Sequence, residues 1–169
     1  MGTGRPGRYL NTVGSRVRPS EFALVHSNEG TFKNSPIRGF TSASGGHGQK
    51  SIELLKKYGI EYNIVKIRPN GVRFGNIPNH AQIFKRTGCE QAWFPETWTE
   101  RTILNAAEHV VALKSNANAP LGKAVFGTYK GVRVGVITNT PKGGGKPGIQ
   151  TIFPDYDQSE KKNNRRKGK

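Results

Sequence analysis

The sequence predicts a one-domain α+β protein, and this prediction depends on its length, its helix patterns and its strand patterns. A chain of 169 residues can bury one hydrophobic core and little more. Helix- and loop-type segments come first along the chain, and short β-rich segments separated by tight turns come later. We therefore expect an N-terminal helical and loop part packed on twisted antiparallel sheet.

The start of the chain is expected to be mostly irregular. Residues 1–20 are rich in Gly, Arg, Ser and Pro, which is typical of a flexible lead or linker. Residues 21–26 form the first apolar segment, a short helix or a strand. Residues 27–49 hold many Ser, Thr, Asn and Gly and predict one long loop. A loop of that length in a small domain is usually functional or disordered.

Two regular elements are expected in the middle of the chain. Residues 49–58 predict a helix with one apolar stripe, and Gly59 supplies its stop. Residues 60–77 predict a hairpin, because the Pro-Asn-Gly sequence at 69–71 suits a tight turn between two apolar runs.

The second half is expected to hold the longest helix and the remaining strands. Its segments are a polar connection at 78–92, a helix at 100–113 capped by Thr97 or Thr99, strands at 123–128 and 132–138, and a last strand at 150–153 that ends at Pro154. The folded domain is therefore expected at 21–158, followed by a basic disordered tail at 159–169.

The charge of the chain argues for a polyanionic partner. Lys and Arg number 27 against 11 Asp and Glu, which gives a formal charge of +16. The body of the chain stays strongly positive even without the basic tail. No basic amphipathic helix with a continuous apolar face is visible, which argues against a membrane surface. Nucleic acid is therefore the leading partner, and a merely solvated basic surface is the alternative.

Several classes of protein are excluded or disfavoured. No apolar run approaches the ~18 residues of a membrane span, and the N-terminus has no signal-peptide pattern. One cysteine, Cys89, excludes an internal disulfide framework and a multi-cysteine zinc site. The only aspartates, Asp155 and Asp157, share one short loop, so a two-metal nuclease is poorly supplied with ligands. Histidine chemistry on RNA, which brings its own 2′-OH nucleophile, is the better expectation and needs no metal or cofactor.

His47 is the strongest catalytic candidate among the four histidines. It lies in the sequence Gly45–Gly48 at the entry to a predicted helix, where glycines let a phosphate approach the backbone and the helix N-terminus favours an anion. His26 follows an apolar segment, His80 lies in a polar turn and His109 lies inside a predicted helix. From context alone, these three are more often ordinary structural or half-exposed histidines.

Cations and stacking faces are plentiful, and composition does not choose among them. A pentacoordinate phosphorus species needs a positive charge. The lysine candidates are Lys50, Lys66, Lys85, Lys123 and Lys130. Thr151 and Tyr156 offer hydroxyl groups, and Phe153 and Tyr156 offer stacking faces for bases. We expect Trp93 and Trp98 in the core.

An ordered set of segments resembles a known family. The segments are His26, Gly45-Gly46-His47 before a helix, 93–98 before a second helix, 131–137, and Gln150-Thr151-Ile152-Phe153-Pro154. In this order they resemble the bacterial EndoU ribonuclease domain over about residues 22–157. The resemblance implies a ribonuclease fold of the barnase–EndoU–colicin–RelE type.

The resemblance also implies a chemistry and its residues. The 2′-OH of RNA attacks the adjacent phosphate without a metal and leaves a 2′,3′-cyclic phosphate and a 5′-OH. His26 and His47 correspond to the family's acid–base pair, with either order of roles open. Lys85 fits the family lysine best by position, although Lys66 lies in the same interval.

The closing motif departs from the family. The Thr-x-Tyr-Pro segment that contacts base and sugar in relatives appears as Thr151-Ile152-Phe153-Pro154. Phe153 keeps a stacking face and lacks the hydroxyl, so the base preference of relatives does not carry over directly. Tyr156 is a candidate to substitute for the missing group.

The family context implies a biological role. Such domains typically form the C-terminal toxin of contact-dependent growth inhibition and other polymorphic toxin systems, and they often attack tRNA. We therefore expect a domain of a larger secreted cell-surface effector that acts in the cytoplasm of a target bacterium. A cognate, acidic immunity protein is the expected protein partner. The alternatives are a non-catalytic RNA-binding module and a basic interaction domain for an acidic protein.

Overall fold

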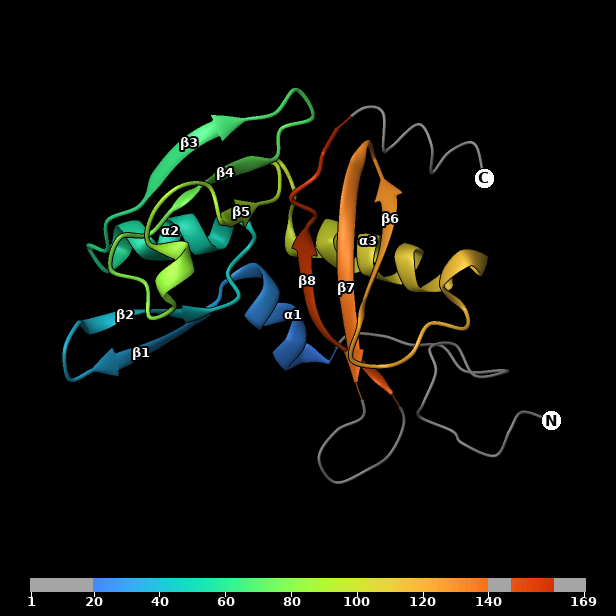
Figure 1. The fold of residues 1–169 in the computed structure, drawn as a ribbon, viewed down its shortest axis with the longest axis horizontal. Coiled ribbons are helices and arrows are strands. Elements are labelled where there is room, and N and C mark those ends of the chain that lie inside the picture. The colour runs from blue at the N-terminus through green and yellow to red at the C-terminus, as the bar shows by residue number, and fades with distance from the viewer. Residues whose placement is uncertain (1–19, 140–146, 160–169) are drawn as a thin grey trace.

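The α+β class is confirmed by the computed structural model, which describes residues 20–139 and 147–159 (Figure 1). The helices are α1 (Glu21–Asn28), α2 (Gln49–Lys57) and α3 (Glu100–Ala112), with short 3-10 turns η1 (Ile83–Lys85) and η2 (Lys114–Asn116). The strands form three antiparallel sheets. The first contains β1 (Thr31–Ser35) and β2 (Gly39–Ser44), and the second contains β3 (Asn63–Ile67), β4 (Arg73–Asn76) and β5 (Gln91–Trp93). The third contains β6 (Ala124–Tyr129), β7 (Val132–Asn139) and β8 (Gly148–Pro154). The predicted lead and tail lie outside the described residues, apart from Ser20 and Ser159.

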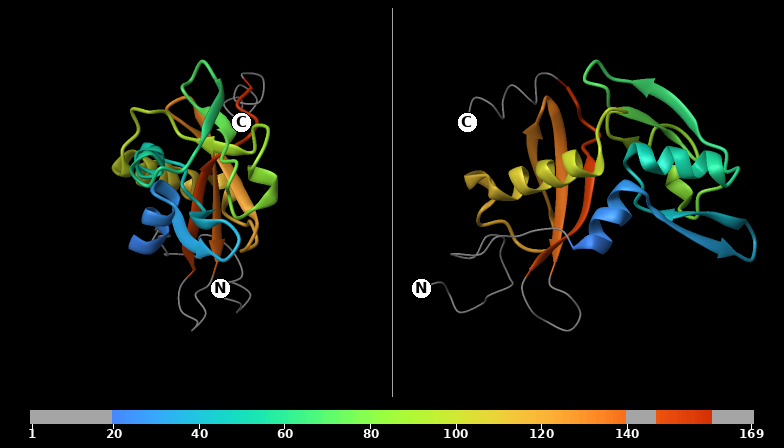
Figure 2. Two further views of the ribbon diagram at one scale, coloured as in Figure 1. Left: turned by 90° about the vertical axis from the view of Figure 1, so that its left-hand side faces the viewer. Right: turned by 180° about the vertical axis from the view of Figure 1, so that it is seen from behind.

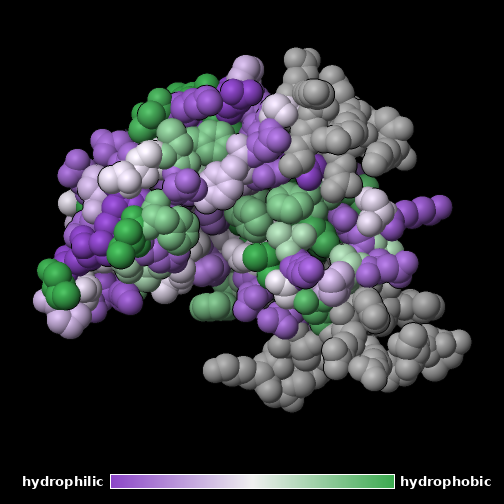
Figure 3. Space-filling view, viewed as in Figure 1, coloured by the Kyte–Doolittle hydropathy of each residue, from purple (hydrophilic) through white to green (hydrophobic). Residues whose placement is uncertain are grey.

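α3 covers one face of the β6–β7–β8 sheet and builds the larger core with it (Figure 2). The helix begins in a capping box at Thr99. Ile103 and Val110 are fully buried in the same cluster as Val134 and Ile152. Because side chains alternate along a strand, the neighbours of these buried residues point away from α3. Hydrophobic side chains gather over β7 and β8 on that second face (Figure 3).

A smaller core lies under α2 and the β3–β4–β5 sheet. Ile52 and Leu55 of the helix are buried with Ile77 and Trp93. Trp93 is fully buried and Trp98 is buried in the larger cluster, so the prediction that both tryptophans lie in the core is confirmed.

α1 joins the two parts of the molecule, because it contacts α2, α3 and β8 (Figure 1). Its N-cap is Ser20, whose side chain accepts a hydrogen bond from the Ala23 amide at 3.0 Å. The predicted lead is therefore too long by this residue. The Ser27 hydroxyl oxygen accepts a bond from the Ile152 amide at 2.9 Å. The outer edge of β8 is thus held by α1.

The predicted loop at 27–49 is wrong, because most of it forms the β1–β2 hairpin. Both strands are exposed along much of their length, so their sequences are polar and resemble that of a loop. They are held from outside the segment: the Tyr58 ring packs edge-on against Phe32 and Phe40 at 5.3 and 5.0 Å. In addition, the Thr41 hydroxyl donates to the Asn79 carbonyl at 2.8 Å. Local composition carries no sign of these tertiary contacts.

The predicted connection at 78–92 is wrong in part, because it contains η1 and β5. β5 pairs with β4 and sets Ala92 opposite Phe74. A strand of three residues is too short for a periodic pattern to reveal it.

The other predicted elements are confirmed within a few residues. They are the helices at 49–58 and 100–113, the hairpins at 60–77 and 123–138, the helical form of the 21–26 segment, and the last strand. The second hairpin turns through Lys130 and Gly131, both with positive φ. In the part of the chain that the structure describes, no helix is long and apolar enough to cross a membrane.

Candidate active site

Backbone hydrogen bonds tie the end of α1 to the loop that carries His47. The Gly46 amide donates to the His26 carbonyl at 2.9 Å, the His47 amide to Ser27 at 2.6 Å and the Gly48 amide to Asn28 at 3.0 Å. These bonds satisfy carbonyl groups that a helix end leaves free. They also bring His26 and His47 together from separate elements.

The glycines before His47 are needed for this close approach. Gly45 and Gly46 have φ values of +66° and +75°, which L side chains rarely adopt. A Cβ atom on Gly45 would lie 2.8 Å from Nε2 of His26. From the sequence, these glycines are expected to let a phosphate approach the backbone. The structure gives Gly45 a second role, which is to let the loop pass against His26, whereas a Cβ atom on Gly46 would lie 2.8 Å from the Ser51 hydroxyl oxygen.

The His47 ring is buried and held in one tautomer. Its Nδ1 lies 2.8 Å from the Ala92 carbonyl oxygen. A carbonyl can only accept, so Nδ1 carries the proton and Nε2 keeps its lone pair. Burial, and then the charge of Lys85, lower the pKa of His47 to about 3. His47 is therefore neutral at neutral pH.

His26 lies on α1 in a more open setting. Its Nδ1 is 3.0 Å from the Thr31 hydroxyl oxygen, and its ring stacks on Phe22 at 6.0 Å. Burial and then Lys85 lower its pKa. The side chain is half-buried, and it is the more accessible of the two rings.

Lys85 is the cation that both histidines share. It lies on η1, is only 7% exposed, and has its pKa lowered to about 8 by burial. None of the described carboxylates forms an ion pair with it. Its charge lowers the pKa values of His26, His47 and His80. Lys66, the alternative in sequence, instead lies on the exposed strand β3.

His80 is a part of this neighbourhood that the sequence analysis missed. It is fully buried, and its Nδ1 accepts a bond from the Gln82 amide at 2.9 Å at the start of η1. Burial, Lys85 and Arg86 lower its pKa to about 4. His80 thus supports the turn that presents Lys85. Its polar sequence context carries no signal of burial.

Thr151 and Phe153 lie on the face of β8 that points away from the core. Ile152 between them is fully buried, so its two neighbours point the other way. The Phe153 ring centroid is 6.2 Å from that of His47. Gly135 of β7 makes room for it, since a Cβ there would lie 2.6 Å from a Phe153 ring atom.

Tyr156 lies elsewhere, with the β3–β4 hairpin. Its hydroxyl donates to the Glu90 carbonyl at 2.6 Å, and its ring stacks on Phe74 at 6.3 Å. Burial and Glu90 raise its pKa. His109 is also distant in the fold, because its ring packs at 5.4 Å on Tyr129 of the β6–β7 hairpin.

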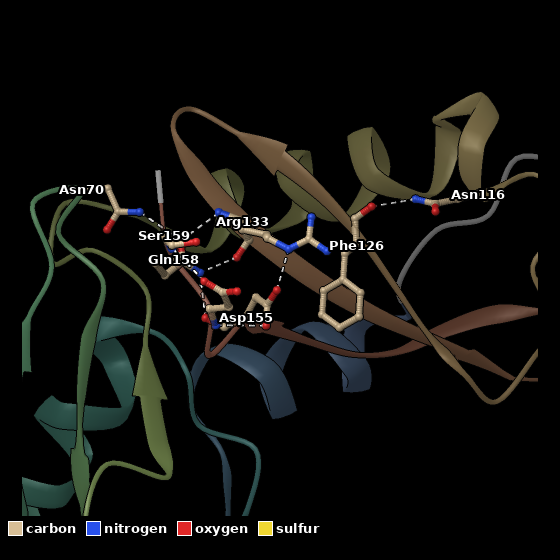
Figure 4. A network of polar contacts seen from close by, with 8 residues as sticks. Asn70, Asn116, Phe126, Arg133, Asp155, Gln158 and Ser159 are labelled. Atoms are coloured by element: carbon tan, nitrogen blue, oxygen red, sulfur yellow. Dashed lines mark hydrogen bonds and ion pairs between the residues drawn. The ribbon is translucent and has the colours of Figure 1, made fainter. Parts of the chain in front are cut away.

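The two aspartates, Asp155 and Asp157, lie directly after β8. Asp155 is buried and forms an ion pair with Arg133 at 2.5 Å (Figure 4). Among residues 20–139 and 147–159, no group of three His, Cys, Asp or Glu side chains is placed to hold a metal ion.

The fold and the matched sequence place this chain among the nucleases. A family model described as "Bacterial EndoU nuclease" matches residues 21–156. The protein belongs to the bacterial EndoU nuclease family, and this membership implies endoribonuclease activity, RNA as substrate and a fold of the barnase–EndoU–colicin–RelE type. Comparisons with curated proteins and with solved structures gave no match.

Proposed function

We propose that the protein cleaves RNA without a metal, by transesterification at a site built from His26, His47 and Lys85. The 2′-OH attacks the adjacent phosphorus, the bond from phosphorus to the 5′ oxygen breaks, and the products are a 2′,3′-cyclic phosphate and a 5′-OH. The observation that carries this proposal is the placement of two histidines, of which His47 is neutral, around one buried lysine. No described carboxylate pairs with that lysine.

His47 is proposed as the general base. With Nδ1–H donated to Ala92, the free lone pair is on Nε2. That nitrogen takes the 2′-OH proton as the oxygen attacks. The depressed pKa keeps His47 unprotonated before substrate binds. A bound phosphate offsets the charge of Lys85, and this raises the basicity of the ring during the reaction.

His26 is proposed as the general acid, and Lys85 as the stabiliser of the phosphorane. His26 is less buried than His47, so its protonated form is more accessible. It gives its proton to the departing 5′ oxygen, after which the two histidines have exchanged protonation states. Lys85, with a pKa of about 8, is mostly charged at neutral pH and neutralises the extra negative charge at phosphorus.

Thr151 and Phe153 are proposed to bind the nucleotide next to the cleaved bond. The Phe153 ring lies beside His47 and offers a face on which a base can stack. Thr151, on the same face of β8, supplies a hydroxyl to the base or sugar. Phe153 has no hydroxyl, so selection among bases depends on stacking more than on hydrogen bonds.

The proposed biological role is that of a toxin domain used against competing bacteria. It rests on the resemblance to domains of contact-dependent growth inhibition and related polymorphic toxin systems. On this proposal the domain is delivered by a larger secreted cell-surface effector and cleaves RNA, with tRNA as the proposed target, in the cytoplasm of the target cell. The charge of +16 favours an acidic immunity protein that covers the site.

The test is incubation of the purified protein with total tRNA in EDTA, followed by chemical mapping of the product ends. Cyclic phosphate and 5′-OH ends that disappear in His47→Ala support the proposal. RNA that is bound in a salt-dependent way and stays intact favours the alternative, a non-catalytic RNA-binding module. Cleavage that appears only when Mg²⁺ is restored contradicts the metal-independent mechanism.

A further inference from the structure

A cavity lies between the β3–β4 hairpin and residues 156–159, and the proposed catalytic chemistry does not use it. Its volume is about 550 Å³, within the range of small-ligand sites. It is lined by Lys66, Arg68, Phe74, Cys89, Glu90 and Tyr156, together with the turn at 157–159. Two cations, the rings of Phe74 and Tyr156, and the carboxylates of Glu90 and Asp157 thus meet in one place.

The ring of Tyr156 forms a fixed stacking surface in this cavity. Phe74 supports it at 6.3 Å with the two planes 28° apart, and its hydroxyl is anchored to the Glu90 carbonyl at 2.6 Å. The side chain is still 50% exposed. An anchored and half-open aromatic ring suits a nucleobase, because every base has a flat face to stack.

The charges of the cavity suit a nucleotide better than a bare anion. Lys66 is exposed on β3, and Arg68 is half-buried with an Nε atom that has no hydrogen-bond partner among the described residues. These side chains can bind a phosphate. The negative charge of Glu90 acts on Tyr156 and therefore lies near the ring. A carboxylate there can accept bonds from the amino group of a base.

The cavity is preformed, because Gln158 holds its wall in place (Figure 4). The Gln158 side-chain oxygen accepts bonds from the Asn70 side chain and from the Arg133 amide, each at 2.9 Å. Its nitrogen donates to the Arg133 carbonyl at 2.7 Å and to the Asp155 carbonyl at 2.8 Å. The segment is thereby joined both to the β3–β4 turn and to β7.

β5 and its pairing with β4 connect the cavity to the loop that carries His47. Phe74 pairs with Ala92, whose carbonyl holds His47. Glu90 precedes Gln91, whose side chain donates to the Gly46 carbonyl at 3.0 Å. The cavity and the His47 loop are thus both held by the short strand β5.

We propose that this cavity is a second nucleotide subsite for the RNA substrate, outside the linkage that is cleaved. A base stacks on Tyr156, and a phosphate of the strand contacts Lys66 and Arg68. The Glu90 carboxylate can accept a hydrogen bond from an N–H group of that base. This inference rests on the proposed function, since it takes RNA as the ligand.

Cys89, the only cysteine, provides a direct probe of the cavity. The wild-type protein is treated with a maleimide, with and without a short mixed-sequence RNA whose 2′-hydroxyls are methylated so that they cannot attack. Labelling is followed by intact mass. We expect the RNA to slow labelling severalfold and a free nucleoside monophosphate at equal concentration to have little effect.

Binding of the same RNA to matched variants completes the test. Tyr156→Ala is expected to weaken binding about tenfold, through lost stacking. Tyr156→Phe, which keeps the ring and its stacking on Phe74, is expected to bind the RNA with an affinity close to that of the wild type. Lys66→Ala lowers the slope of log affinity against log salt by about 0.7, whereas the exposed α2 control Lys56→Ala does not.

Two results overturn the subsite. One is a labelling rate that RNA does not change, and the other is equal RNA affinity in Tyr156→Ala and Tyr156→Phe. Equal protection by the free nucleotide overturns the assignment to an RNA strand. None of these measurements requires cleavage. If the protein leaves ordinary RNA intact but RNA protects Cys89, the proposed function fails and the subsite stands. If the protein cleaves RNA but RNA does not protect Cys89, the proposed function stands and the subsite fails.

Discussion

The Nδ1 atom of His47 lies 2.8 Å from the carbonyl oxygen of Ala92, so one backbone group on β5 selects the tautomer of a ring on the loop before α2. The bond leaves Nε2 with its lone pair. Since Ala92 is itself held in the β4–β5 ladder, the ring orientation is coupled to the sheet. His47 is thus poised to accept a proton before any substrate binds.

The first prediction concerns the two histidines themselves. We expect His47→Ala and His26→Ala each to lower kcat on RNA by about 10²- to 10⁴-fold, the usual contribution of one acid–base group. His109→Ala is the matched control, because that ring lies on α3 beside Tyr129. Equal losses in all three variants would show that the assay reports folding and not chemistry.

The second prediction is the alkaline side of the pH profile. With His26 as the proposed general acid, the free enzyme needs this ring protonated, so log kcat/KM should decline as pH rises through the lowered pKa of His26. It should decline more steeply above about pH 8, where Lys85 loses its charge. Lys85→Arg keeps its charge and should retain the first decline while losing the second. An unchanged second decline in this variant would rule out Lys85 as its source.

A third prediction tests the glycine that lets the loop pass His26. Gly45→Ala places a methyl group against the His26 ring and forces alanine to a positive φ. Gly88→Ala meets the same backbone strain, about 1–2 kcal/mol, in open space. We expect both variants to lower the free energy of unfolding, and Gly45→Ala alone to lose activity while still folded. Full activity in folded Gly45→Ala would contradict the assigned contact.

The fourth prediction concerns base stacking at the cleaved nucleotide. Phe153→Ala should raise the barrier by about 1–3 kcal/mol, or about 5- to 150-fold in kcat/KM. Phe153→Tyr keeps the ring and should stay close to the wild type in rate, with a changed order of preference among bases. The measurement is cleavage of oligonucleotides that differ at one base. If Phe153→Ala cleaves as fast as the wild type, the stacking role is wrong.

Much of the fold follows from local sequence, and the errors share one cause. The helix at 100–112 is long enough for the spacing of its apolar residues to show a helical period. The tight turn at Lys130-Gly131 is indicated by its glycine, which adopts a positive φ. β1, β2 and β5 were missed because they are short or exposed, and they are held by side chains from distant segments. Contacts such as Thr41 with Asn79 leave no mark on the composition of either segment.

The sequence proposes which residues form the candidate site, but it does not predict how the fold brings them together. His47 stood out through its glycines, whereas His26 and Lys85 were assigned only by their order in a family pattern. Backbone hydrogen bonds between α1 and the Gly45–Gly48 loop bring the two histidines together. A hydrogen bond from the Ile77 amide to the Lys85 carbonyl, at 3.0 Å, holds η1 next to the end of β4. Local sequence predicts neither. The burial of His80 was missed for the same reason.

The most direct test of the catalytic assignment uses an RNA whose scissile 5′ oxygen is replaced by sulfur. A thiolate leaves without a proton, so it does not need the general acid. We predict that this substrate restores cleavage by His26→Ala and does not restore it for His47→Ala. Restoration in His47→Ala instead would reverse the two roles, and restoration in neither variant would contradict acid–base catalysis by this pair.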